Sequence, residues 1–165
     1  MIDIFDNFYC GKRVLVTGHT GFKGSWLSIW LHELGAEVVG VSQEPFTNRD
    51  NYVLSGIGHK IMADLRFDIC DGQKMKEIFQ KYQPEIVFHL AAQPLVRYSY
   101  EQPVETYEAN VMGTIYVMEA IRATSSVKVG VMITTDKCYD NKEQMRGYKE
   151  DDPFGGYDPY SSSKG

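Results

Sequence analysis

The sequence predicts an α/β fold in which helices cover both faces of a doubly wound parallel sheet. Two observations carry this prediction. Five apolar runs alternate with helical patterns along the 165 residues. The runs are continuous rather than alternating in polarity, as expected for strands that are buried on both faces. Right-handed crossovers between such strands give the sheet order 3-2-1-4-5, numbered along the chain.

The first two strands are expected at residues 13–17 and 38–41, both rich in valine. A turn with three glycines follows the first strand. A helix with one broad apolar stripe then runs to about Glu33, and Gly35 is placed to end it. Residues 42–60 are rich in Pro, Asn and Gly, so they are expected to be mostly loop with one short helix.

The third and fourth strands are expected at residues 61–64 and 86–90. Between them, Asp71 is placed as the N-cap of a helix that Pro84 stops. A long helix then starts at about Pro103, because proline suits a first turn. Its apolar residues line one side: Val104, Tyr107, Val111, Ile115 and Met118.

The rest of the chain continues the alternation of strand and helix. A fifth strand is expected at residues 127–133, and a polar, glycine-rich segment follows at 140–158. A last helix begins at Pro159. The sequence shows no internal repeat, and its length suits one domain.

Composition and charge exclude several classes of protein. The formal net charge of −5 argues against a nucleic-acid-binding surface, which needs a basic patch. No apolar run approaches the length of about 18 residues that a membrane span needs. The acidic first residues are unlike a signal peptide. The three cysteines are scattered without metal-ligand spacing and suit a reducing compartment. We therefore expect a cytoplasmic protein with no metal site and with neither nucleic acid nor membrane as a partner.

The glycine turn predicts a diphosphate site. Gly18, Gly21 and Gly24 fall between the first strand and the first helix. Without a Cβ atom, the backbone can take positive φ and approach a phosphate closely, and the N–H groups of the helix start then face the anion. The spacing G-x-x-G-x-x-G differs from the G-x-G-x-x-G of simple dinucleotide folds, so the glycines alone are a weak signal. His19, within the turn, is expected either to pack or to contact phosphate.

Four stretches end at the carboxyl edge of the predicted sheet, where ligands of such folds bind. They are the glycine turn and residues 68–69, 91–93 and 134–139. Small side chains at Ala91 and Ala92 would let a dinucleotide lie across a strand end; the alternative is that they only pack closely.

A tyrosine and a lysine on the last helix form the second candidate site. Tyr160 and Lys164 are four residues apart and so share one face of the helix. A neighbouring ammonium stabilises phenolate, lowers the pKa of a tyrosine from about 10 and makes it a base near pH 7. His89 lies within an apolar strand and is expected to be a core histidine with its hydrogen bonds satisfied.

In combination these motifs resemble the extended short-chain dehydrogenase/reductase superfamily over the whole chain. Five stretches carry the resemblance: residues 17–24, 68–69, 89–93, 110–114 and the pair at 160 and 164. Residues 134–139 read Thr-Thr-Asp-Lys-Cys-Tyr and are similar to the Ser-Thr-Asp-Glu-x-Tyr signature of the sugar-nucleotide 4,6-dehydratases, with Lys137 in place of the glutamate. The lysine at this position and the stretches 91–97 and 156–160 are similar to the corresponding residues of the family members that act on CDP-glucose.

The resemblance implies a Rossmann-like NAD-binding domain, with residues 1–165 as the N-terminal portion of a longer enzyme. The C-terminal, substrate-binding part is absent, so this portion alone is expected not to turn over substrate. The second strand ends at Val41-Ser42-Gln43-Glu44, so no acid sits in the usual place for binding a ribose 2′-hydroxyl. Lys23 and Arg49 would suit a 2′-phosphate. NAD rather than NADP is therefore implied only by the resemblance. The residues implied to hold NAD are Gly18, Thr20, Gly21, Phe22, Lys23, Gly24, Asp68, Ile69, Leu90, Ala91, Ala92, Gln93, Thr134, Tyr160 and Lys164.

The resemblance also implies that CDP-glucose is dehydrated to CDP-4-keto-6-deoxyglucose, in the synthesis of bacterial surface lipopolysaccharide. Tyr160 would take the proton of the sugar 4-hydroxyl, which Thr135 hydrogen-bonds, while hydride leaves C4 for the nicotinamide. Lys164 would bind the nicotinamide ribose and tune the tyrosine. Asp136 would protonate the 6-hydroxyl as water is lost across C5 and C6, and hydride would return to C6. Lys137 is either the base at C5 or a partner of a carboxylate or the ligand.

The resemblance also implies that the protein is a homo-oligomer, a dimer or tetramer, that pairs through the two helices that follow strands four and five. Two other functions stay open. A sugar-nucleotide 4-epimerase or decarboxylase of the same superfamily needs Tyr160 and Lys164 but no acid after Thr135, so Asp136 argues against it. A non-catalytic dinucleotide sensor would keep the glycines but would have no need of the catalytic set.

Overall fold

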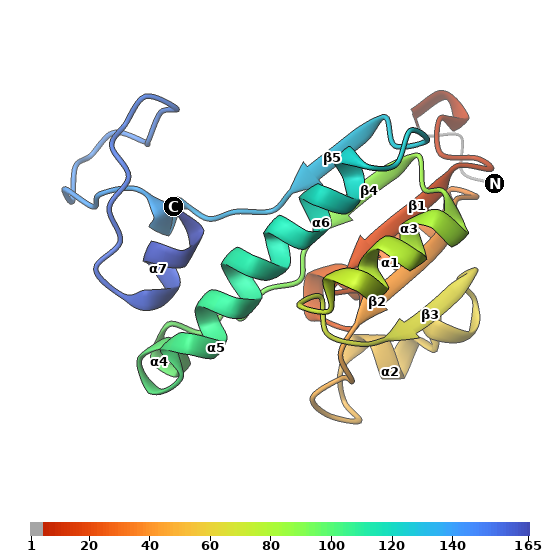
Figure 1. Cartoon of the computed structure of the whole chain (residues 1–165), viewed down its shortest axis with the longest axis horizontal. Coiled ribbons are helices and arrows are strands. Elements are labelled where there is room, and N and C mark those ends of the chain that lie inside the picture. Colours follow the sequence, from red (N-terminus) through yellow and green to blue (C-terminus); the bar gives the residue numbers. More distant parts are fainter. Residues whose placement is uncertain (1–4) are drawn as a thin grey trace.

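The computed structural model describes residues 5–165, and its five strands form one parallel sheet in the order β3-β2-β1-β4-β5 (Figure 1). This order confirms the doubly wound topology. The strands are β1 (Arg13–Thr17), β2 (Glu37–Ser42), β3 (Ala63–Arg66), β4 (Ile86–His89) and β5 (Val129–Met132). The central strand β1 places Thr17 opposite Val41 of β2 and His89 of β4. The carboxyl ends of these three strands therefore meet at one edge.

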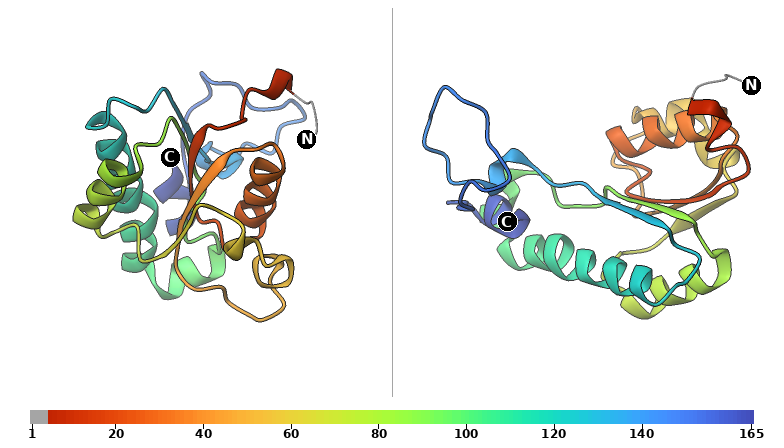
Figure 2. Two further views of the ribbon diagram at one scale, coloured as in Figure 1. Left: turned by 90° about the vertical axis from the view of Figure 1, so that its right-hand side faces the viewer. Right: turned by 90° about the horizontal axis from the view of Figure 1, so that it is seen from above.

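Two hydrophobic cores lie on opposite faces of the sheet because side chains alternate along each strand. On β1, Leu15 faces α3 (Gly72–Tyr82) and α6 (Gly113–Arg122), in the core that contains Phe79 and Val117. Val14 and Val16 face α1 (Phe22–Glu33), in the core that contains Leu31. Figure 2 shows α1 on one side of the sheet and α3 with α6 on the other.

Two short elements on the α1 side explain why the third strand begins two residues later than expected. Helix α2 (Asn51–Ser55) and the 3-10 turn η2 (Ile57–His59) follow β2. The Ile61 N–H donates to the Ile57 carbonyl, and the Ile61 side chain is buried in the core under α1. Pairing with β2 therefore starts only at Ala63, opposite Val39. The predicted strand at 61–64 was wrong by that shift.

The long helix expected from Pro103 is present, with a π-turn inside it. It consists of α5 (Pro103–Tyr107), the π-turn η3 (Glu108–Met112) and α6. Its buried face carries Thr106, Asn110, Gly113, Val117 and Ala120. The apolar stripe identified from the sequence instead lies outward, with Val104 70%, Ile115 43% and Met118 52% exposed. The periodicity thus marked a real face of the helix, but that face is not in the core.

Beyond the carboxyl edge of the sheet, three helices gather at one end of the molecule (Figure 1). They are α4 (Val96–Glu101), which the sequence did not predict, the start of α5, and α7 (Pro159–Lys164). The segment between β5 and α7 contains the 3-10 turn η4 (Asp136–Cys138) and returns through an antiparallel bridge between Tyr139 and Phe154. A 3-10 turn η1 (Phe5–Asn7) precedes β1. Among residues 5–165, no helix is both long and apolar enough to cross a bilayer.

Candidate active site

The glycine turn is packed tightly enough to exclude side chains at two of its three glycines. Gly18 has φ of +75°, and a Cβ atom there would lie 2.8 Å from the Ala91 amide nitrogen. A Cβ atom at Gly24 would lie 2.0 Å from the Gly18 carbonyl oxygen, which no backbone could tolerate. At Gly21 the atom nearest to an added Cβ atom would be 3.2 Å away, so the requirement for glycine is weaker at this position. The turn is thus closed against itself and against the end of β4.

The start of α1 leaves backbone donors available. Its N-cap residue, Gly21, provides no side-chain hydrogen bond, so the first N–H groups of the helix have no cap. Phe22 and Lys23 are exposed here, and Phe22 has 76% of its surface in solvent. The helix end therefore has the character of an anion site.

Thr20 is turned into the protein rather than toward this site. It is only 6% exposed, its hydroxyl donates to the Gln43 carbonyl at 3.1 Å, and the Ser42 hydroxyl lies 2.7 Å away. These contacts tie the glycine turn to the end of β2. Any contribution of Thr20 to cofactor binding would come from its backbone.

A polar cluster around the buried ring of His19, which the sequence analysis missed, anchors the turn to β3. His19 is fully buried, and its Nε2 atom lies 2.8 Å from Oδ1 of Asp64. The other oxygen of Asp64 accepts hydrogen bonds from the Tyr52 hydroxyl (2.5 Å) and from Arg66 (2.9 Å). Burial lowers the pKa of His19, although Asp64 opposes that shift. Gly40 in β2 makes room for the ring, because a Cβ atom there would lie 2.4 Å from it. His19 therefore packs, the first of its two expected roles.

At the next strand end, Asp68 is exposed and already engaged. One carboxylate oxygen accepts the Cys70 N–H at 2.8 Å, and the other accepts the Gln43 amide at 2.6 Å. The side chain of Ile69 is buried in the core, where it packs so closely on Gly113 that a Cβ atom at that glycine would lie 2.5 Å away. Of the pair, only Asp68 presents a side chain at the edge.

The end of β4 is held by hydroxyl and amide groups from other elements. The Thr17 hydroxyl accepts from the N–H groups of Leu90 and Ala91, both at 3.1 Å, and Ala91 and Ala92 are half-buried at the edge. The Gln93 amide donates to Thr106 at 2.9 Å, and its carbonyl oxygen accepts from the Leu95 N–H. The Gln93 side chain is therefore used in holding the 93–95 loop to α5 rather than at the open edge.

Helix α7 brings the tyrosine and the lysine to this edge. Its N-cap residue Asp158 accepts hydrogen bonds from the Ser161 N–H (2.8 Å) and the Ser161 hydroxyl (2.6 Å). The Tyr160 N–H donates to the Ser99 hydroxyl of α4 at 3.1 Å, which fixes the first turn. The Lys164 ammonium donates to the Ile133 carbonyl, just past β5, at 3.2 Å, and burial lowers its pKa.

The Thr-Thr-Asp-Lys stretch lies between β5 and α7. The Thr135 hydroxyl accepts the Lys137 N–H at 3.3 Å and donates to the Asp136 carboxylate at 3.2 Å, while Thr134 makes a long contact of 3.5 Å with the Lys164 carbonyl. Asp136 and Lys137 are exposed. Burial would raise the pKa of Asp158, but hydrogen bonds from Ser161 and the positive charge of Lys137 lower it.

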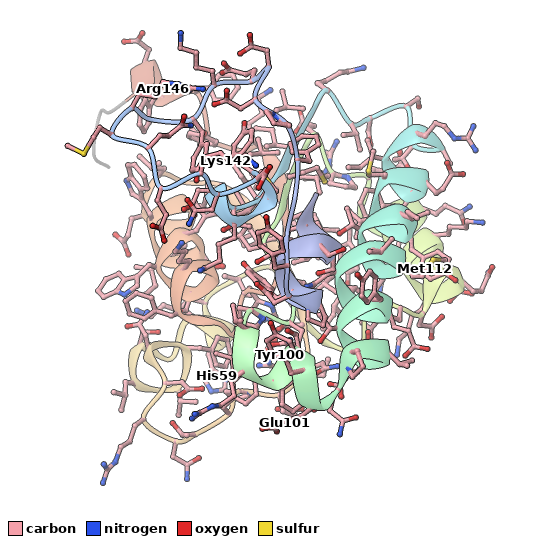
Figure 3. The ribbon with its side chains drawn as sticks, turned by 90° about the vertical axis from the view of Figure 1, so that its left-hand side faces the viewer. His59, Tyr100, Glu101, Met112, Lys142 and Arg146 are labelled. Atoms are coloured by element: carbon pink, nitrogen blue, oxygen red, sulfur yellow. The ribbon has the colours of Figure 1, made fainter. Side chains whose placement is uncertain are left out.

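Asn110 connects the strand end to α7, a role that the sequence did not reveal. Its side chain is buried, accepts the Gln93 N–H at 2.8 Å and donates to the Gln93 carbonyl at 3.1 Å and to the Ser163 hydroxyl at 2.9 Å. In Figure 3, which looks toward the carboxyl edge, α7 lies between α4, with Tyr100 and Glu101, and the segment that carries Lys142 and Arg146.

Within residues 5–165, no group of three or more acidic, histidine or cysteine side chains is arranged to hold a metal ion.

The sheet order, the glycine turn and the placement of α7 assign the chain to the extended short-chain dehydrogenase/reductase class. Comparison with known proteins narrows this assignment: the chain belongs to the GDP-mannose 4,6 dehydratase family, whose family model matches residues 15–165.

Individual relatives agree with that family. A CDP-glucose 4,6-dehydratase of Salmonella typhimurium is 53% identical over the whole chain, and the chain spans 45% of that relative's length. A GDP-mannose 4,6-dehydratase of Vibrio cholerae is 31% identical over 93% of the chain and 43% of its own length. The chain thus covers about half of the curated relatives that it matches.

Solved structures confirm the fold. An epimerase of Methanothermobacter thermautotrophicus covers 98% of the chain with a TM-score of 0.81 at 27% identity, and the match takes in 47% of that structure. The UDP-glucose 4-epimerase of Thermus thermophilus, solved as a complex with NAD, covers 92% of the chain with a TM-score of 0.78 at 30% identity, over 47% of its own length.

Proposed function

We propose that the complete protein is an NAD-dependent sugar-nucleotide 4,6-dehydratase that converts CDP-glucose to CDP-4-keto-6-deoxyglucose. The observation that carries the proposal is the position of α7. This helix holds Tyr160 and Lys164 beyond the sheet edge at which the glycine turn opens, and beside the Thr135–Asp136 stretch that follows β5. The 53% identical CDP-glucose 4,6-dehydratase supports this substrate.

The residues of the glycine turn fit a dinucleotide. A Cβ atom at Gly24 or Gly18 would collide with backbone, and the uncapped start of α1 offers N–H groups to a diphosphate. Asp68 and the Ala91–Ala92 pair would flank the rest of the cofactor along the edge. Bound NAD would supply a hydride acceptor that later becomes a donor, so the cofactor ends the cycle unchanged.

In this proposal the chain's own groups move the protons. Tyr160 takes the proton of the sugar 4-hydroxyl, and Thr135 hydrogen-bonds that hydroxyl and orients it. Lys164 would hold the nicotinamide ribose beside Tyr160. Asp136 protonates the departing 6-hydroxyl. Asp136 and Lys137 are both exposed just after β5, so neither is closed off from a ligand.

The base at C5 is the remaining assignment. Lys137 occupies the position of the glutamate in related dehydratases, and its charge acts on Asp158, which is the N-cap of α7. We assign the C5 proton to Lys137, which must be a neutral amine at that step to accept it. The alternative is that this lysine only supports Asp158 or contacts the ligand.

The proposed function is tested with the complete protein and three nucleotide sugars. CDP-glucose should give the alkaline absorbance of a 4-keto-6-deoxy sugar, and Tyr160→Phe should lower turnover by about 100-fold or more because the proton acceptor is lost. Product from UDP-glucose or dTDP-glucose alone would refute the CDP assignment. Formation of a 4-epimer would indicate the epimerase alternative, and cofactor binding without turnover would indicate a sensor.

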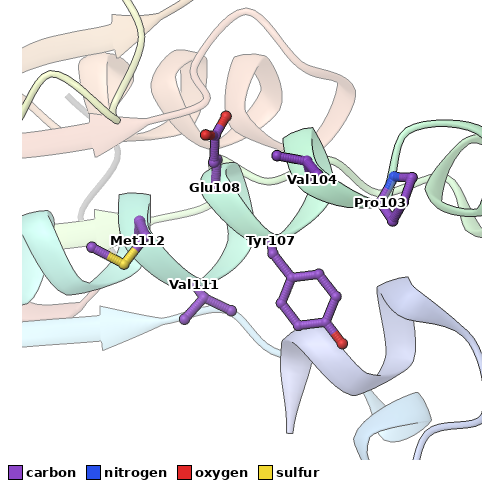
Figure 4. A pocket seen from close by; sticks show the side chains of 6 residues that line it. All are labelled: Pro103, Val104, Tyr107, Glu108, Val111 and Met112. Carbon is purple, nitrogen blue, oxygen red and sulfur yellow. The ribbon is translucent and has the colours of Figure 1, made fainter.

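We further propose that the complete protein is a homo-oligomer, as a dimer or tetramer, that pairs through the outer face of the long helix. The exposed stripe on this helix adjoins an apolar hollow lined by Pro103, Val104, Tyr107, Glu108, Val111 and Met112 (Figure 4). An apolar face of this kind is typical of a subunit contact. The cytoplasmic location and the role in lipopolysaccharide synthesis expected from the sequence remain part of this proposal.

A further inference from the structure

A buried hydrogen-bond chain crosses the molecule beneath the proposed active site, and no step of the proposed reaction uses it. Nδ1 of His89 lies 2.7 Å from the Thr17 hydroxyl, and Nε2 lies 3.0 Å from the Thr114 hydroxyl. The histidine is only 2% exposed. These hydrogen bonds therefore connect β1, β4 and the long helix through the side chain of His89.

The partners fix the direction of every bond in this chain. The Thr114 hydroxyl donates to the Asn110 carbonyl at 2.6 Å, so it must accept its second hydrogen bond from Nε2–H of His89. Nδ1 is then unprotonated and accepts from Thr17. Burial and the charge of Lys164 lower the pKa of His89 to about 4, which agrees with a neutral ring. The expectation of a satisfied core histidine is confirmed.

The far end of this hydrogen-bond chain lies in the π-turn of the long helix. Asn110 is within η3, and such turns occur frequently at functional sites. The hydroxyl of Thr114 supplies a donor to the Asn110 carbonyl at this irregular point. The side chain of the same asparagine holds the Gln93 backbone on one side and the Ser163 hydroxyl of α7 on the other.

We infer that His89 and Thr114 are positioning residues for helix α7. They hold the π-turn in the geometry that lets the Asn110 amide reach the end of β4 and α7 together. Through that amide they determine the position of Tyr160 and Lys164 relative to the glycine turn. Only the kinetic consequence rests on the proposed function; the docking of α7 does not.

The test compares Thr114→Val with Thr114→Ser in the complete protein. Valine has the shape of threonine without the hydroxyl, whereas serine keeps the hydroxyl. For Thr114→Val we expect kcat on CDP-glucose to fall about tenfold, because a hydrogen bond in a buried network is lost. The dissociation constant for NAD should stay near that of the wild type, because the glycine turn is untouched. Thr114→Ser should restore kcat.

Hydrogen exchange gives a second readout that does not require activity. Amides of residues 160–164 should exchange about tenfold faster in Thr114→Val, while those of α3 keep their rates. Equal changes in both helices would indicate general destabilisation and overturn the inference, as would wild-type kcat together with wild-type exchange in α7. If the wild type binds NAD but does not act on a nucleotide sugar, the proposed function fails and exchange alone decides the inference.

A matched pair at His89 covers the case in which Thr114→Val does not fold. His89→Gln places an amide near the position of Nε2 and keeps a donor for Thr114, whereas His89→Phe fills the ring volume and loses both bonds. We expect exchange in α7 to stay slow in His89→Gln and to rise in His89→Phe. The same rate in both variants would overturn the inference.

Discussion

At the scale of single residues, the glycine turn is the most tightly constrained part of the site. The spacing of its three glycines does not distinguish between them, whereas the structure shows that they differ in how strictly glycine is required. Gly18 and Gly24 are required by backbone atoms that lie within 3 Å of a would-be Cβ atom, whereas Gly21 faces only one atom at 3.2 Å. The difference arises because Gly24 faces the Gly18 carbonyl and Gly18 faces the end of β4, contacts that no spacing rule contains.

We predict that Gly24→Ala destabilises the complete protein by about 3 kcal/mol, because the clash is with backbone that cannot move aside. The added Cβ atom would lie 2.0 Å from the Gly18 carbonyl oxygen. Urea unfolding measures the change. Gly147→Ala is the matched control, because a Cβ atom there meets nothing within 4 Å. Equal stability of the two variants would show that the turn is looser than the structure has it.

At the scale of elements, helix boundaries and caps were well predicted. Asp71 caps α3 by accepting the Lys74 N–H at 3.0 Å, and Gly35 follows α1 with φ of +81°. Helix α4 was missed because its apolar residues are few and Pro94 and Pro103 flank it closely. The π-turn was missed as well, because it depends on a hydroxyl from the next turn and on the contact between Gly113 and Ile69.

The exposed stripe of the long helix gives a prediction at this scale. In the complete protein, Ile115→Glu combined with Met118→Glu should shift the species seen by light scattering toward the monomer, because two charges would be buried in the contact. Leu54→Glu on α2 is the control; this side chain is 73% exposed on another surface. An unchanged mass for the double variant would place the contact elsewhere.

At the scale of the whole molecule, two buried histidines couple the fold to pH. His19 links the glycine turn to β3, and His89 links β1 and β4 to the long helix. Burial lowers the pKa of both from 6.5, and for His89 to about 4. Because the unfolded chain binds protons that the folded chain excludes, these groups favour folding above pH 6.5 and cease to do so as the pH falls.

We therefore expect the free energy of unfolding to drop by about 3 kcal/mol from His89 alone as the pH falls from 6.5 to about 4. Urea midpoints measured at several pH values test this expectation. His89→Gln should flatten the dependence even if it lowers stability at every pH. The exposed residue His59 provides a control, and His59→Gln should leave the slope unchanged. If the free energy of unfolding of His89→Gln depended on pH as steeply as that of the wild type, groups other than His89 would be responsible.

Sequence pattern was enough to predict the order of the strands, the glycine turn and the helix that carries Tyr160 and Lys164, because period, spacing and chain order are local properties. Which of the predicted residues present a side chain to the site became clear only from the folded chain. Folding turned Thr20 and Gln93 inward, buried Ile69, and joined His19 to Asp64 and Asn110 to Ser163. Those outcomes depend on hydrogen bonds and packing between residues far apart in the chain, which local patterns do not encode.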